Sequence, residues 1–164
     1  MTMVHLLIML AAMLQTPRAA PSSPQAAVDE LLAVDRAFSA ASAQTTVVPG
    51  LTPMFAPDVI MPTPSGTFAR GLDAVVATLQ ANPDNVAGRV DWTPIRGGLS
   101  ADGTQGFTFG FMTQHKADGT TTPLKYMTYW VKGADGWRAV AYKRTRRPEG
   151  EASMAMIPAA SPAA

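Results

Sequence analysis

The tripeptide Ala-Asp-Gly occurs three times in this chain of 164 residues, at 101–103, 117–119 and 134–136. Asp-Gly is a strong signal for a β-hairpin turn, because glycine accepts the positive φ that such turns require. The sequence around the turns alternates, as in Phe107-Thr108-Phe109-Gly110-Phe111, which is typical of strands. Three hairpin turns therefore predict four consecutive antiparallel strands, over about 89–100, 105–115, 123–132 and 137–145.

Upstream of these strands the hydrophobic pattern changes to a helical period. In segment 25–43, side chains recur at spacings of three and four residues, at Val28, Leu31, Asp35, Phe38 and Ser42. This spacing predicts one long helix with a single face turned to the core. A second helix is predicted over 72–81, and Asn82-Pro83 should end it, since proline disfavours helix in the residue before it.

Five prolines lie between positions 49 and 64 and interrupt the segment between the two helices. They predict a short helix over 52–55 and one short extended piece over 59–62. Two to three helices followed by a run of strands indicate an α+β fold. We expect a strongly curved antiparallel sheet, with four long strands and one short strand, packed on the N-terminal helices.

The two ends of the chain are predicted to lie outside this domain. Val4–Leu14 is an apolar run with the length of a signal-peptide core, too short to span a bilayer, and small residues follow at Ala19 and Ala20. We expect export to the periplasm or the medium without a stable membrane anchor; the alternative is a buried N-terminal helix. The expected organisation is a signal peptide over 1–20, a linker over 21–24, the folded domain over 25–147 and a disordered Ala/Pro-rich tail over 148–164.

Composition excludes several classes of function. The formal net charge is only +1, whereas nucleic-acid binding depends on a strong basic excess. The chain has no cysteine, and its only histidines are His5 and His115, so we expect no metal and no cofactor. Gly97-Gly98 precedes a predicted turn rather than a helix, so it is not a phosphate loop. We interpret one basic cluster as a solvated strand end in preference to a phosphate-binding patch: Lys143, Arg144, Arg146 and Arg147.

Asp35 is the one acidic side chain on the apolar face of the first predicted helix, so it should face the sheet. A carboxylate there would be partly desolvated, with a raised pKa unless it is paired. One interpretation makes it a general acid or base beside Tyr126 or Tyr142. The other makes it a buried hydrogen-bond or salt-bridge partner, for Arg70 or a backbone amide. We favour the structural role.

Six short segments follow one another in a recognisable order, at 32–38, 54–59, 70–75, 106–110, 125–130 and 135–140. In these segments and in the order of its elements, the chain resembles the nuclear transport factor 2-like superfamily, in particular its SnoaL-like branch of domains of unknown function. The resemblance covers about 25–147 and is specific for fold rather than for activity. In this superfamily the sheet curls around a helix to form a cone whose mouth admits small, mostly apolar molecules.

The resemblance also implies which side chains line the cone. It favours an inward direction for Thr108, Gly110, Tyr126, Thr128, Trp130, Val140 and Tyr142. The expected ligand cavity is made of Asp35, Phe38, Arg70, Thr108, Tyr126, Thr128, Trp130 and Tyr142. Arg70 would either clamp an anion at the mouth or cover apolar surface with its stem; we favour the second. Phe107, Phe109, Phe111, Met127 and Tyr129 would then form an apolar outer face, which predicts a homodimer packed sheet to sheet.

The isomerase-like members of the superfamily use a catalytic aspartate in a segment that corresponds to 55–64 here. This chain has Thr63 at that position, and threonine is no general base at neutral pH. The helix tyrosine of those enzymes is also missing, since Ala37 and Phe38 stand nearby. We therefore expect a non-catalytic binder of a small apolar or amphipathic ligand, or of a protein partner. The alternative is a cofactor-independent isomerase, dehydratase or hydrolase that uses Asp35 and Tyr142.

Overall fold

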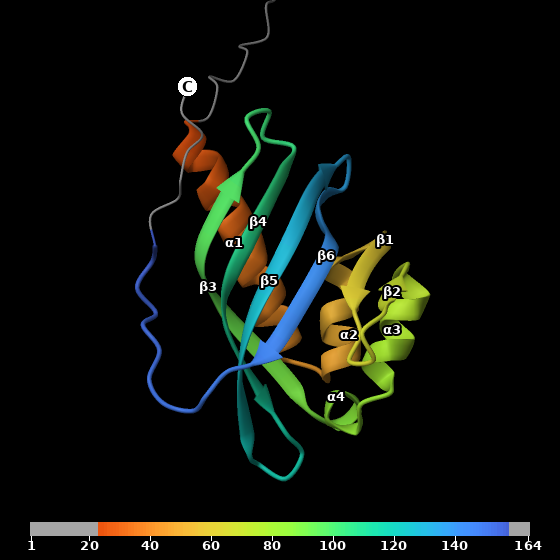
Figure 1. The fold of residues 1–164 in the computed structure, drawn as a ribbon. Helices are drawn as coiled ribbons and strands as arrows, with labels where there is room; N and C mark the ends of the chain where they lie inside the picture. Colours follow the sequence, from red (N-terminus) through yellow and green to blue (C-terminus); the bar gives the residue numbers. More distant parts are fainter. Residues whose placement is uncertain (1–22, 158–164) are drawn as a thin grey trace, which may run out of the picture.

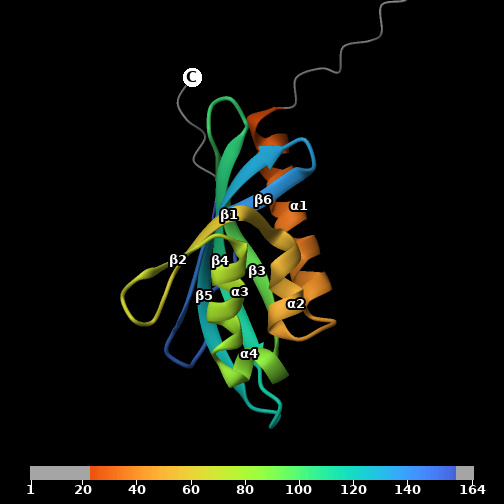
Figure 2. The ribbon, with the colours of Figure 1, turned by 90° about the vertical axis from the view of Figure 1, so that its right-hand side faces the viewer.

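A computed structural model of the chain describes residues 23–157. Its sheet has six strands in the order β2-β1-β6-β5-β4-β3, and the helices cover one face of it (Figures 1 and 2). The elements in chain order are α1 (Pro24–Ser42), α2 (Val47–Leu51), the 3-10 helix η1 (Thr52–Met54), β1 (Phe55–Pro62), β2 (Phe68–Arg70), α3 (Leu72–Gln80), α4 (Pro83–Ala87), β3 (Arg89–Leu99), β4 (Gln105–His115), β5 (Thr121–Gly133) and β6 (Gly136–Arg146).

The four long strands β3 to β6 confirm the predicted antiparallel meander. Each Ala-Asp-Gly triplet sits in the turn between two of them, and the glycines Gly103, Gly119 and Gly136 have φ of 70°, 84° and 88°. In the first turn the Asp102 carboxylate accepts hydrogen bonds from the Ser100 hydroxyl at 2.6 Å and from the Thr104 amide at 3.0 Å. These bonds hold the pKa of Asp102 down to about 2. The Asp118 carboxylate accepts from the Thr120 amide at 2.9 Å in the second turn, so the first two turns combine a glycine backbone with a carboxylate cap.

The other end of the sheet differs from the prediction of a purely antiparallel sheet with one short strand. The predicted short helix over 52–55 is present as η1. β1 follows it directly from Phe55, earlier than the predicted extended piece, and runs parallel to β6. β2 was not predicted; it pairs antiparallel with β1 and adds a sixth strand. The pairing of β1 with β6 is irregular between Phe55 and Ile60, and this irregularity accommodates Pro57 within a strand. The sheet is therefore mixed; the predicted extended piece over 59–62 is the second half of β1, and β2 was missed.

Two caps fix the ends of the helices. The Ser23 hydroxyl accepts a hydrogen bond from the Ala26 amide at 3.1 Å and begins α1 one residue before the predicted start. The Asn82 side chain caps α4 by accepting from the Asp84 amide at 3.0 Å, and Pro83 is the first residue of that helix. Asn82-Pro83 thus ends α3 as predicted and also starts α4, which was not predicted.

The core lies between the concave face of the sheet and the helices. Trp130, Tyr142 and Leu31 are among its largest fully buried side chains. α1 crosses this face against β3 and turns one stripe towards it, made of Val28, Leu31, Leu32, Asp35, Ser39 and Ser42. The chain after β6 passes along the sheet towards the edge strand β3, where the Ile157 amide donates to the Ile95 carbonyl at 2.7 Å (Figure 1).

Two domain predictions fall partly or wholly on residues that the structure does not describe. The predicted signal peptide, 1–20, lies outside 23–157, and so does the end of the predicted disordered tail. Within 23–157, no helix combines the length and the apolar character needed to cross a membrane.

Candidate functional site

Asp35 lies at the centre of a closed polar cluster under α1. Its side chain is 0% exposed, and both carboxylate oxygens accept hydrogen bonds. The Trp92 indole N–H donates to Oδ1 at 2.7 Å, and the Tyr126 hydroxyl donates to Oδ2 at 2.7 Å. The helical spacing therefore placed Asp35 on the correct face, but its partners are Trp92 and Tyr126 rather than Arg70 or a backbone amide.

Burial decides the ionisation of this cluster. It raises the pKa of Asp35, and the hydrogen bonds from Tyr126, Trp92 and Thr108 oppose that rise only in part. Burial likewise raises the pKa of Tyr126, and the adjacent Asp35 carboxylate raises it further. Both oxygens of this carboxyl group therefore accept a hydrogen bond from the protein, and burial closes the group off from solvent.

Trp130 is buried in the same interior, next to Thr108. Its indole N–H donates to the Thr108 hydroxyl at 2.8 Å, and its ring stacks on Phe38 with 5.9 Å between centroids. Thr128 pairs with Thr108 across β4 and β5, and its hydroxyl is buried without a hydrogen-bond partner among the described residues. Thr108, Thr128 and Trp130 are fully buried in the interior that the sequence predicted to be a ligand cavity.

Tyr142 closes the interior on the side of β6. Its hydroxyl contacts the Met112 sulfur at 3.8 Å, and its ring packs against Phe55 with 5.4 Å between centroids. Burial raises its pKa to about 12, although the nearby Arg144 guanidinium acts in the opposite direction. At neutral pH this hydroxyl is protonated and is no base.

Seven of the eight predicted cavity residues come together in this interior, and one does not. Arg70 lies on the edge strand β2 and is exposed, so it takes no part in the cluster. Val140, also predicted to point inward, is only partly buried. β6 has a bulge there: Trp130 pairs with Ala139 and Tyr129 pairs with Ala141, so Val140 is the extra residue and the side-chain alternation shifts by one.

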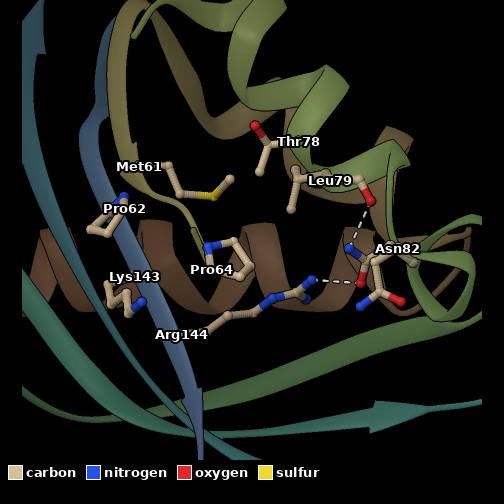
Figure 3. A pocket seen from close by; sticks show the side chains of 9 residues that line it. Met61, Pro62, Pro64, Thr78, Leu79, Asn82, Lys143 and Arg144 are labelled. Atoms are coloured by element: carbon tan, nitrogen blue, oxygen red, sulfur yellow. Dashed lines mark hydrogen bonds between the residues drawn. The ribbon is translucent and has the colours of Figure 1, made fainter. Parts of the chain in front are cut away.

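A pocket of about 290 Å³ lies elsewhere, at the rim of the cone between α3, α4, β1 and β6 (Figure 3). None of the predicted cavity residues lines it. One wall is apolar, and the other carries amides and the Arg144 guanidinium (Figure 3). The lining residues are Met61, Pro62, Pro64, Thr78, Leu79, Asn82, Asn85, Lys143 and Arg144.

Asn85 holds the polar wall of this pocket together. It is 3% exposed, its amide donates to the Leu79 carbonyl at 2.8 Å, and its Oδ1 accepts from Arg144 at 2.6 Å and from Gln114 at 3.1 Å. The dashed lines in Figure 3 mark the bonds that involve Leu79 and Arg144. The guanidinium of Arg144 is therefore fixed by a neutral partner. The prediction that the basic cluster is a solvated strand end is wrong for Arg144, which is partly buried and faces this wall.

Sequence reasoning missed this pocket because four separate segments build it. The one usable signal was alternation along the last strand. Tyr142 was expected to point inward, so Arg144, two residues later, belongs to the same face. The described residues hold no group of three or more His, Asp or Glu side chains placed to bind a metal ion.

The comparisons with known proteins concern the fold. Neither a protein-family model nor a curated protein sequence matches the chain. Among solved structures, a domain of unknown function with a cystatin-like fold from Nostoc punctiforme has 17% identity and a TM-score of 0.57, and the match covers 71% of this chain and 77% of that one.

Two further structures agree with this likeness. An NTF-2-like protein of unknown function from Shewanella oneidensis has 12% identity and a TM-score of 0.52, over 74% of this chain and 98% of that one. A ketosteroid isomerase-like protein from Erwinia carotovora atroseptica has 18% identity and a TM-score of 0.50, over 75% and 96%. The chain is thus an α+β protein with a cystatin-like fold. Within that class it has the predicted nuclear transport factor 2-like fold.

Proposed function

We propose that this protein is a non-catalytic binding domain, which holds a small amphipathic molecule in the rim pocket. The lining of that pocket carries the proposal. It offers an apolar wall and hydrogen-bond donors, but none of its nine side chains is a carboxyl, imidazole, thiol or phenol group. Such a lining can orient a ligand, whereas acid–base chemistry needs a group that exchanges protons near neutral pH.

The alternative is an acid–base enzyme that uses Asp35 and Tyr142. That function requires a substrate to reach a carboxyl group whose two oxygens already accept hydrogen bonds. It also requires Tyr142 to exchange a proton although its pKa is raised to about 12. Both observations favour binding without turnover. We further propose that the protein is exported, which the apolar run over 4–14 supports.

Filling the pocket tests the binding function. We expect octanol or octanoate to bind the unmodified protein with one-to-one stoichiometry in isothermal titration calorimetry. Thr78→Trp should lower that affinity at least about tenfold, because the indole would occupy the pocket. Ala77→Trp is the matched control, since Ala77 is exposed on the same helix and does not line the pocket. Absence of binding to either probe, or equal binding by the Thr78 variant, would contradict the proposal.

We also propose a homodimer that packs through the outer face of the sheet. Met127 is 54% exposed and Tyr129 is 41% exposed there, beside the stacked rings of Phe107 and Phe109. Burying this apolar surface in a second copy would remove it from water. Light scattering at micromolar concentration should give the mass of a dimer, and Met127→Lys should shift it to that of a monomer. A monomeric unmodified protein would contradict the proposal.

A further inference from the structure

Of the two basic residues that line the rim pocket, Arg144 points into it, whereas Lys143 is exposed and its side chain lies on the other side of β6 (Figure 3). None of the other lining residues is acidic. The side-chain ion pairs within residues 23–157 are His115–Asp91, Lys116–Asp84 and Lys132–Glu30, so neither of the two cations takes part in one. The pocket therefore presents uncompensated positive charge to whatever enters it.

Arg144 is the better placed of the two to recognise a ligand. Its guanidinium is held by Asn85, which is itself bonded to α3 and β4, so its position is set before a ligand arrives. Its Nη1 atom is buried without an acceptor among the described residues. The hydrogen-bonding capacity of the guanidinium is thus only partly used by the protein.

The wall of the pocket opposite Arg144 is apolar. Met61, Pro62, Pro64 and Leu79 give it an apolar surface, and Figure 3 shows the Met61 and Leu79 side chains on the far side of the pocket from Arg144. A ligand that satisfies both walls carries an anionic group at one end and a short apolar body at the other.

We propose that the rim pocket recognises a small monocarboxylate with an apolar tail, and that Arg144 binds its carboxylate. This proposal rests on the binding function above and names the class of ligand. A phosphate is a poorer match, because phosphate sites usually add several backbone N–H donors. The nearby start of α4 cannot supply them all, since the Asn82 side chain already accepts from the Asp84 amide. Lys143 adds attraction at longer range.

The test compares octanoate, octanol and octyl phosphate as probes on the full chain. We expect octanoate to bind at least about tenfold more tightly than octanol, since a charge-assisted hydrogen bond is present only in the first. Added salt should weaken octanoate binding and leave octanol binding unchanged. Equal affinities for octanoate and octanol would overturn the carboxylate assignment while the binding function stands. Tighter binding of octyl phosphate would also overturn it, and absence of all binding would remove the binding function itself.

A variant pair assigns the effect to Arg144. Arg144→Gln should reduce octanoate affinity to that of octanol, and the matched control Arg146→Gln should keep the difference, because Arg146 is exposed on the same strand and does not line the pocket. Retention of the full preference by a folded Arg144→Gln protein would overturn the role of Arg144. If that variant does not fold, the salt dependence and the octanoate-to-octanol ratio of the unmodified protein decide the proposal.

Discussion

Asp35→Ala is expected to lower the free energy of unfolding by about 4 kcal/mol. The substitution leaves the Trp92 indole N–H and the Tyr126 hydroxyl buried without their acceptor, and each such loss costs about 1–3 kcal/mol. Urea denaturation followed by tryptophan fluorescence measures the change. A free energy of unfolding within about 1 kcal/mol of the unmodified protein would contradict a structural role for Asp35.

Asp35→Asn is the matched control for this cluster. The amide oxygen still accepts from Trp92, and the amide nitrogen can donate to the Tyr126 oxygen once that hydroxyl rotates. We therefore expect it to cost less than half as much as the alanine variant. An asparagine variant as unstable as the alanine variant would show that the negative charge, rather than the hydrogen bonds, holds the cluster together.

A comparison of the unmodified protein with Asp35→Asn also tests how the free energy of unfolding depends on pH. Burial raises the pKa of Asp35 above its ordinary value of 3.8, so the folded state binds this proton more tightly than the unfolded state. The contribution of Asp35 to stability is then fully present below about pH 4 and is lost as the pH rises through the folded-state pKa. Asp35→Asn lacks this loss, so it should gain stability relative to the unmodified protein between acidic and neutral pH. A relative change in the opposite direction would contradict the raised pKa.

Gly110→Ala is expected to destabilise the protein by about 3 kcal/mol or more. A Cβ at this buried position in β4 would lie 2.0 Å from the Thr93 carbonyl oxygen and 2.9 Å from the Pro94 Cα, both backbone atoms of β3. Relief requires the two strands to separate, which costs more than the shift of a flexible side chain. Thermal and urea unfolding measure the effect.

Gly133→Ala provides the comparison. The nearest atom to a Cβ there is the Gly136 carbonyl oxygen at 4.0 Å, and no positive φ constrains the residue. Its effect should stay within about 0.5 kcal/mol. Equal effects of the two substitutions would show that the close approach of β3 and β4 at Gly110 is not tight enough to matter.

The long strands were predictable because local signals define them. Each Asp-Gly turn needs a glycine at positive φ, and the alternation beside it needs no knowledge of distant segments. β2 lacks such signals, and only the second half of β1, over 59–62, was predicted. Pro57 and Pro62 argue against a strand, and the structure tolerates them only at an irregular pairing and at a strand end. The bulge at Val140 likewise depends on the neighbouring strand rather than on the residue itself.

The site was less predictable than the fold, because contacts between distant segments decide it. Helical spacing placed Asp35 on the correct face of α1, but the alignment of α1 with β3 selected Trp92 as its partner. Arg144 looked like one of four solvated cations in sequence. Asn85, far from it in the chain, draws it into the wall of a pocket. The structure thus supports the structural role already favoured for Asp35, and it changes the interpretation of Arg144 towards ligand binding.

The most direct test of where a ligand binds is a titration of the ¹⁵N-labelled full chain with octanoate, followed by two-dimensional NMR. The amide signals of Leu79, Asn82 and Arg144 should move with added ligand. The indole N–H signals of Trp92 and Trp130, which report on the interior around Asp35, should stay in place. Movement of the indole signals with a silent rim would contradict binding at the pocket and return Asp35 to consideration as a catalytic acid or base.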